Sequence, residues 1–344
     1  MAVASAAVTP PRRAHTSGSP VRISRRRRLK NQMWWWCCGI GLALLVAPVV
    51  WVLYGVLSRG ISGWRWDVIW TPTIGVGGGL SGAIVGTFVI TAGVVVIAGV
   101  VGVSAGIFLA EFCRPGIVAT VLRSASEVLS GVPSIVFGYV GYVALVIGLR
   151  WKFSLLAAWI VLSMLVVPYV AKSTELALNQ VPIAYREGGE ALGMERFHVL
   201  RRLVLRSAVP GILTGLVVAV AISIGETAPL LYTAGSSTTY PTAALIHSPV
   251  GYLTSAVWTD YESPFPVQHA LANDAALILV VLVVALIVGS RLIVRATQRY
   301  APNRALAAST KRPWRPFPRS RRRHEVAGLF GPGTAPADPD ELAQ

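Results

Sequence analysis

Long stretches of apolar residues constrain this chain more than any other feature of its sequence. The longest, residues 79–110, contains 32 residues and no charged side chain. As an α-helix it would be roughly 48 Å long, whereas the hydrocarbon core of a bilayer is ~30 Å thick. Since 54% of all residues are hydrophobic and only 13% are charged, an ordinary soluble core cannot bury this much apolar surface. We therefore expect an integral membrane protein.

Six apolar stretches predict six transmembrane helices, and hence an all-α integral membrane fold. They are residues 34–57, 79–110, 132–149, 153–170, 209–234 and 275–293. In the second span, Gly82 and Gly86, and likewise Gly102 and Gly106, have the spacing that lets helices approach closely in lipid. A chain with 33 glycines also produces such spacings by chance, so both explanations stay open.

Positive charges fall mainly on one side of this predicted topology. Of the 31 Lys and Arg residues, 27 lie before the first span, in residues 111–131, in residues 172–208 or in residues 291–344, from the end of the last span onward. The other side retains Arg59, Arg65, Arg150 and Lys152. Because positively charged loops tend to stay in the cytoplasm, we expect both termini to be cytoplasmic.

Composition divides the chain into four parts. Residues 1–33 and 298–344 are expected to be disordered basic cytoplasmic tails. Residues 34–78 would form the first transmembrane helix and an outer loop, and residues 79–297 the rest of the transmembrane domain. Much of the net charge of +16 lies in the tails with few aromatic residues, so we expect contact with membrane lipid and not with nucleic acid.

The sequence offers little for catalysis or for binding a cofactor. Its three cysteines, Cys37, Cys38 and Cys113, lie in or beside apolar stretches and do not form a disulfide framework. None of the five histidines lies within a strongly apolar stretch, which argues against a metal site in the membrane. No lysine follows a glycine, so the phosphate-binding Walker loop is absent. We expect no metal, no cofactor and no ATPase activity in this chain.

Residues 182–207 form the most strongly charged segment between two predicted spans. The segment has the pattern of two short amphipathic helices with a glycine-containing break between them. In its second half, Phe197, Leu200 and Val204 form an apolar stripe. An ordinary surface loop fits this pattern as well.

This segment resembles the cytoplasmic loop of bacterial ABC importer permeases, whose pattern is Glu-Ala-Ala, three residues, Gly, nine residues, Ile-x-Leu-Pro. Glycines replace the two alanines here and Arg206 replaces the proline, which should make the segment more flexible. The resemblance implies a cytoplasmic coupling helix between the fourth and fifth spans. The residues implied to contact the ATPase are Glu187, Gly188, Gly189, Glu190, Ala191, Gly193, Leu203 and Leu205.

Within that superfamily, the chain resembles the permeases of phosphate importers of the PstA type. Three stretches carry the resemblance: residues 127–138 (EVLSGVPSIVFG), 181–193 (VPIAYREGGEALG) and 210–231 (PGILTGLVVAVAISIGETAPLL). The resemblance implies the MetI-like ABC importer permease fold. It also implies ATP-driven import of inorganic phosphate with a paired PstC-type permease and an extracytoplasmic PstS-type phosphate-binding protein. ATP and Mg would be used by a dimeric PstB-type ATPase.

Glu226 is the one acid inside a predicted span, deep in a helix that would begin at residue 209. An acid at such depth should face the interior of the bundle and have a partner. We expect Glu226 at the gate of the translocation path, opposite a cation of the paired permease, with Ser223, Thr227 and Pro229 beside it. Ile222 stands where family members commonly have Arg, so the chain offers phosphate no buried cation. A capping acid near the outer interface also fits Glu226.

Other functions remain open at this stage. The chain could be an importer permease for another oxyanion or small solute. An intramembrane enzyme acting on lipid would need several converging titratable groups, but only Glu226 is available. A scaffold that binds nucleic acid through its tails would leave the six spans unexplained. Residues 234–273 have no Lys or Arg and would either lie at the membrane surface or receive the binding protein.

Overall fold

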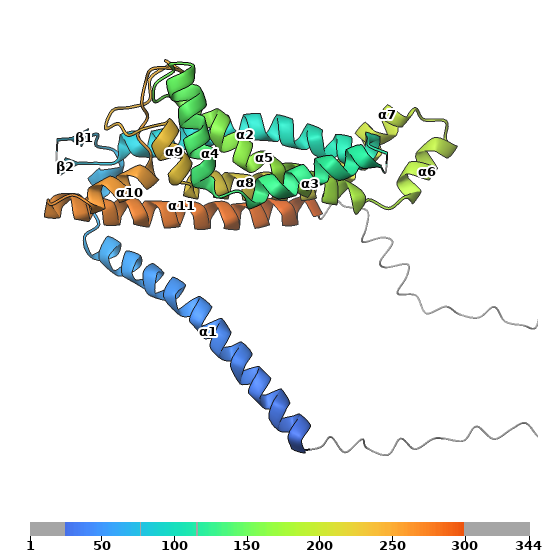
Figure 1. Cartoon of the computed structure of the whole chain (residues 1–344), viewed down its shortest axis with the longest axis horizontal. Coiled ribbons are helices and arrows are strands. Elements are labelled where there is room, and N and C mark those ends of the chain that lie inside the picture. Colours follow the sequence, from blue (N-terminus) through green and yellow to red (C-terminus); the bar gives the residue numbers. More distant parts are fainter. Residues whose placement is uncertain (1–24, 76, 115, 299–344) are drawn as a thin grey trace, which may run out of the picture.

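The described part of the chain is a bundle of helices (Figure 1). The computed structural model describes residues 25–298, except residues 76 and 115. Four long helices pack along one another: α2 (Ser81–Ile107), α5 (Leu155–Asn179), α8 (Leu205–Gly225) and α11 (Pro266–Gln298). The short helices α6 (Ala184–Ala191) and α7 (Arg196–Val199) lie at one end of the bundle, here called the α6 end. Helix α10 (Leu253–Tyr261) lies at the opposite end, the α10 end.

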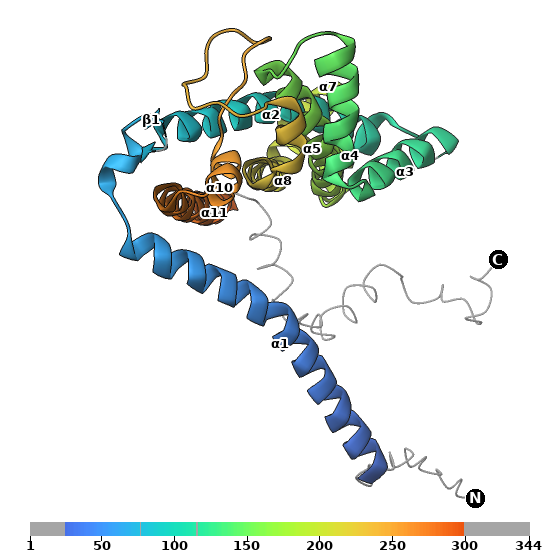
Figure 2. The same ribbon diagram turned by 60° about the vertical axis from the view of Figure 1, so that its left-hand side comes forward.

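The first helix leads away from the bundle (Figure 2). Helix α1 (Arg25–Ser62) begins before residue 34, so residues 25–33, expected in the tail, are helical; residues 1–24 and 299–344 of the predicted tails lie outside the described residues. Its apolar side chains are exposed, as in Trp35 (72%) and Trp51 (80%). Near its end, Gly60 lies against Leu277 of α11. Such a helix is suited to lipid or to another subunit.

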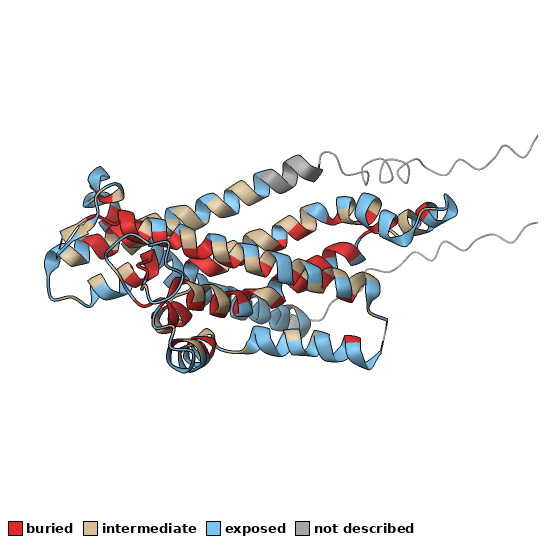
Figure 3. Cartoon of the chain, turned by 90° about the horizontal axis from the view of Figure 1, so that it is seen from above, coloured by how far each residue is buried: buried red, intermediate tan, exposed pale blue. Residues whose placement is uncertain are grey.

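Glycines allow α2 and α5 to pack closely, which favours the first of the two explanations left open for the spacing of Gly102 and Gly106. A Cβ atom at Gly102 would lie 2.7 Å from Cβ of Val170, and one at Gly106 would lie 2.6 Å from the carbonyl oxygen of Ala171. Residues of both helices belong to one core cluster, and buried residues gather in the interior of the bundle (Figure 3). Gly86 instead faces the backbone of Gly251, in the loop before α10.

The third predicted span is only the second half of a bent pair of helices. Helix α3 (Ile117–Gly131) occupies most of the stretch that we expected to be a loop, and α4 (Ser134–Gly141) continues as the π-helical turn η3 (Tyr142–Gly148). The two halves meet at an angle of 95°. Pro133 is the residue before α4, and the residue before a proline is disfavoured in helical conformation, which accounts for the bend at Val132.

The fifth predicted span is also broken, and the expectation of one helix through residues 209–234 was wrong. Helix α8 ends at Gly225, Glu226 has extended backbone (ψ 133°), and α9 (Ala228–Thr233) begins two residues later. Pro229 lies in the first turn of α9, where its missing N–H costs no hydrogen bond. Glu226 therefore lies at a helix end and not within a helix.

The α10 end contains small elements around the ends of α2 and α11. The 3-10 helix η1 (Trp66–Ile69) precedes an antiparallel hairpin in which β1 (Thr73–Ile74) pairs with β2 (Gly77–Gly78) through Thr73–Gly78 and Ile74–Gly77. Helix α10 and the start of α11 lie within the predicted outer loop 234–273.

Hydropathy and length support a multi-pass membrane protein. Among the described residues, five helices are long and apolar enough to cross a membrane, and the bent pair of α3 and α4 makes a sixth if it counts as one span. The prediction of an all-α membrane fold is therefore confirmed.

Candidate functional site

The segment with the importer-permease pattern folds into two short helices at the α6 end, as predicted. After α6 comes a turn closed by Gly193, whose φ of +72° favours glycine. The amides of Gly193 and Met194 donate to the carbonyls of Glu190 (2.9 Å) and Gly189 (3.0 Å). This pair of bonds is a Schellman motif, which ends the helix and explains why the pattern has Gly at this place.

The second short helix runs directly into the bundle. Helix α7 continues through the π-helical turn η4 (Leu200–Val204) into α8. Leu200 and Val204 of the predicted apolar stripe are buried, whereas Phe197 is 58% exposed, so the stripe was only partly right. Leu203 and Leu205 are half-buried against the same core.

Most of the predicted coupling residues on α6 are exposed. Glu187, Gly188, Glu190, Ala191 and Gly193 face outward, and the adjacent Leu192 is 81% exposed. Gly189, in contrast, is buried against α7. A Cβ atom at this position would lie 2.7 Å from Cγ2 of Val199. The glycine that replaces an alanine of the family pattern thus lets α6 lie close to α7, and does not simply add flexibility.

Arg186 joins α6 to two other parts of the bundle. Its guanidinium donates to both carboxylate oxygens of Glu111, with Nη2–Oε1 at 2.6 Å and Nε–Oε2 at 3.4 Å. It also donates to the carbonyls of Val181 (3.0 Å) and Leu178 (3.2 Å) at the end of α5. Glu111 lies in the π-helical turn η2 (Phe108–Phe112), which continues α2.

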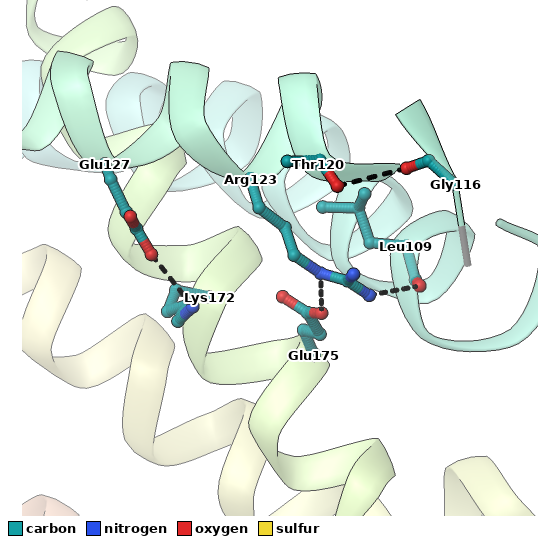
Figure 4. A network of polar contacts seen from close by, with 7 residues as sticks. All are labelled: Leu109, Gly116, Thr120, Arg123, Glu127, Lys172 and Glu175. Carbon is teal, nitrogen blue, oxygen red and sulfur yellow. Dashed lines mark hydrogen bonds and ion pairs between the residues drawn. The ribbon is translucent and has the colours of Figure 1, made fainter. Parts of the chain in front are cut away.

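A second arginine contacts the same turn from α3 (Figure 4). Nε of Arg123 lies 2.8 Å from Oε1 of Glu175 on α5, and its Nη2 donates to the Leu109 carbonyl at 3.4 Å. Glu175 is almost fully buried, with 7% of its side chain exposed. Beside this pair, Lys172 and Glu127 form a looser, exposed ion pair at 3.6 Å.

Glu226 lies where the two broken helices meet. Ser134, the first residue of α4, lies close to its carboxylate. The Thr254 hydroxyl donates to its carbonyl oxygen at 3.1 Å. Helices α4 and α9 are packed so closely that a Cβ atom at Gly138 would lie 2.7 Å from Cα of Pro229. None of the ion pairs formed among residues 25–298 includes Glu226.

The other predicted gate residues surround this meeting point but differ in access. Ser223 is 2% exposed, and its hydroxyl donates to the Ala219 carbonyl one turn earlier in α8. Thr227 precedes α9 and is half-buried, and Pro229 is buried in the first turn of α9. Thr227 and Glu226 are therefore the more accessible members of the set.

A polar cavity of about 460 Å³ opens at the α10 end. Among the residues that line it are Ser236, Ser237, Thr238, Ser255, Thr259 and Asp260. Burial raises the pKa of Asp260 to about 6. This part of the predicted outer loop is thus polar and weakly acidic.

Sequence reasoning missed Glu111, Arg123, Glu175 and Arg186. A signal was present, because Glu111 and Glu175 each follow an apolar stretch within a few residues. Acids this close to a membrane segment need partners, although the sequence did not show which cations these would be.

Comparison with known proteins agrees with this geometry. Residues 102–301 match the family model described as binding-protein-dependent transport system inner membrane component. The chain is 49% identical over 287 residues to phosphate transport system permease protein PstA 2 of Mycobacterium bovis, covering 83% of this chain and 92% of that protein. It is 34% identical over 248 residues to phosphate transport system permease protein PstA of Yersinia pestis, covering 71% and 83%.

A solved structure shows the same fold. An inward-facing structure of the MetNI methionine ABC transporter matches with a TM-score of 0.52 and 20% identity, covering 63% of this chain and 95% of that one. The prediction of a MetI-like ABC importer permease fold is confirmed. The chain therefore belongs to the family of binding-protein-dependent transport system inner membrane components, as a multi-pass membrane permease of the PstA group and not an ATPase.

Proposed function

We propose that this chain carries inorganic phosphate into the cell as one permease of an ATP-driven importer. The observation that carries the proposal is the 49% identity to a phosphate transport system permease over 83% of this chain. Both relatives described above are named for phosphate, so a permease for another oxyanion or small solute is not favoured.

The partners that we propose are a PstC-type permease, a dimeric PstB-type ATPase and an extracytoplasmic PstS-type binding protein. The ATPase, which uses ATP and Mg, would contact the exposed face of α6 and the turn at Gly193. The binding protein would contact the α10 end, where the outer loop is polar and lacks Lys and Arg. Both termini would be cytoplasmic, on the side of the α6 end.

The path for phosphate would pass the meeting point of the two broken helices. Broken helices in transporters commonly frame the substrate site, because their free backbone groups replace the substrate's water. Glu226 would act in the gate, paired with a cation of the PstC-type subunit, and Ser223, Thr227 and Pro229 would shape the path beside it. An acid would repel phosphate directly, so a role in gating suits Glu226 better than a role in binding.

Uptake of labelled phosphate tests the substrate and the coupling segment together. Cells that lack this chain should lose uptake at limiting phosphate, and the intact chain should restore it. A Glu187→Lys variant reverses a charge on the exposed face of α6 and should not restore uptake. If cells that lack the chain kept normal phosphate uptake but lost sulfate uptake, the chain would be a permease for a different anion.

Glu226→Gln tests the gate, because it removes the charge and keeps the shape. We expect phosphate uptake to be lost while the variant still purifies with its partners. The matched control is Glu262→Gln, which neutralises an exposed acid at the α10 end. Normal uptake by Glu226→Gln would exclude a role for this charge in the gate.

A further inference from the structure

The π-helical turn η2 lies between two arginines from different helices. Arg186 of α6 holds the Glu111 side chain, and Arg123 of α3 holds the Leu109 carbonyl. Helix α6 otherwise packs mainly on α7 and η4. The Arg186–Glu111 pair is thus a direct polar connection from α6 to η2, the turn in which α2 ends.

This connection is partly buried and held at several points. The side chains of Arg186 and Glu111 are only 27% and 16% exposed. The same guanidinium also holds two carbonyls at the end of α5. An arginine held at four acceptors has little freedom to follow one neighbour without the others, so a displacement of α6 should be passed on to η2.

The second arginine continues the connection toward the broken helices. Arg123 ties η2 to α3 and, through Glu175, to α5 (Figure 4). Helix α3 ends at Gly131, and the bend that follows leads directly to α4, which packs closely on α9, the helix that follows Glu226. A continuous series of polar contacts and helices therefore joins α6 to the proposed gate.

We propose that η2, held between Arg186 and Arg123, is the joint through which movement of α6 reaches the bend between α3 and α4. Arg186 and Glu111 are positioning residues in this scheme, since neither is required to touch phosphate. The scheme rests on the proposed function, because it assigns the source of the movement to the ATPase.

The sharpest variant is Glu111→Gln. It removes the charged link to η2 but leaves the bonds of Arg186 to the Leu178 and Val181 carbonyls, which hold the α5–α6 turn. Lys172→Gln is the matched control, because it removes a nearby ion pair that is longer and more exposed. Both variants should be studied in the complete transporter, reconstituted in lipid vesicles with its permease, ATPase and binding-protein partners.

The first readout is phosphate uptake per ATP hydrolysed. Single substitutions along a coupling network change the coupling by about 2- to 30-fold, so we expect Glu111→Gln to lower this ratio by roughly ten-fold while the ATPase stays bound. The control should keep the wild-type ratio. An unchanged ratio in Glu111→Gln, or a loss of uptake and hydrolysis in equal proportion, would overturn the proposal.

The second readout does not depend on the substrate. Amide hydrogen exchange is compared in the complete transporter with and without nucleotide trapped in the ATPase. Trapping should change exchange in residues 184–191 of both the wild type and Glu111→Gln. In residues 117–133 it should change exchange in the wild type only. An equal response of residues 117–133 in Glu111→Gln would refute the joint. Wild-type vesicles that take up no phosphate would instead refute the proposed function.

Discussion

Two adjacent glycines in α6 have different neighbours, and this difference gives a direct test at the scale of single residues. We expect Gly189→Ala to destabilise the protein by about 1–3 kcal/mol, because the new methyl group would press on Val199. Gly188→Ala meets nothing within 4 Å and should be neutral or stabilising by up to ~1 kcal/mol, since Ala is the better helix former. Thermal unfolding of the purified variants measures both. Equal unfolding temperatures would mean that α6 and α7 are not in close contact.

Asp260 at the α10 end should make stability depend on pH. Burial raises its pKa from the ordinary value of 3.8 to about 6, so between these values the folded chain binds more protons than the unfolded chain. Ionisation of this acid therefore costs stability, and the cost is complete above pH 6 and absent below pH 4.

Asp260→Asn removes this cost. Because Asp260 is only partly buried, we expect a gain on the order of 1 kcal/mol at pH 8 that shrinks as the pH falls from 6 toward 4. Unfolding temperatures at pH 8 and pH 5 measure it, with the exposed Glu262→Gln as control. A stability gain of Asp260→Asn that is the same at both pH values would contradict a raised pKa of Asp260.

Among the helices, contact between α2 and α5 depends on glycine at particular positions. Gly106→Ala would place a methyl group 2.6 Å from a backbone carbonyl, which cannot rotate away, so a loss of about 1–3 kcal/mol is expected. Gly99→Ala meets only the end of the Leu216 side chain at 3.4 Å and should be tolerated. Thermal unfolding in detergent should separate the two variants, and similar stabilities would contradict the close packing of α2 on α5.

Hydropathy located the helices well but could not see how they break. The membrane helices were found from apolar length alone, because lipid requires apolar residues wherever a helix is exposed. The break at Glu226 has local signals in Gly225 and Pro229, but apolar residues on both sides hid it. Helix α3 was taken for a loop because Arg123 and Glu127 lower its hydropathy, although both residues face partners on α5.

The candidate site was predicted unevenly for a related reason. The coupling residues between Glu187 and Gly193 have a sequence pattern with defined spacing, so their placement on α6 and the following turn could be predicted. Contacts such as those of Arg123 with Glu175 and of Arg186 with Glu111 join residues that are far apart in the sequence. Such contacts depend on how the helices pack, which hydropathy and local spacing do not contain.

At the scale of the whole molecule, the chain is one component of an ABC importer, and it works with a paired permease, an ATPase and a binding protein. Its two ends differ accordingly. The α6 end has exposed side chains of both charges and apolar groups such as Leu192, whereas the α10 end has a polar cavity.

Orientation of these ends can be measured in cells. In a chain with Cys37, Cys38 and Cys113 changed to serine, we expect Glu262→Cys to react with an impermeant maleimide added outside. Glu195→Cys, at the α6 end, should react only after the membrane is permeabilised. Both positions are exposed, so access and not burial decides the result. The reverse pattern would place the α6 end outside and exclude contact with a cytoplasmic ATPase.

The π-helical turn at the end of α2 also has a consequence for how related chains can differ in length. A π turn contains one residue more than the α-helical turn that it replaces, so it corresponds to a single-residue insertion. Deleting one residue ahead of Glu111 in this turn would restore α-helical spacing and shift the side chains of the turn around the helix axis. Glu111 would then point away from Arg186. Importers that rely on this contact should therefore keep the extra residue, even where their apolar side chains have been exchanged.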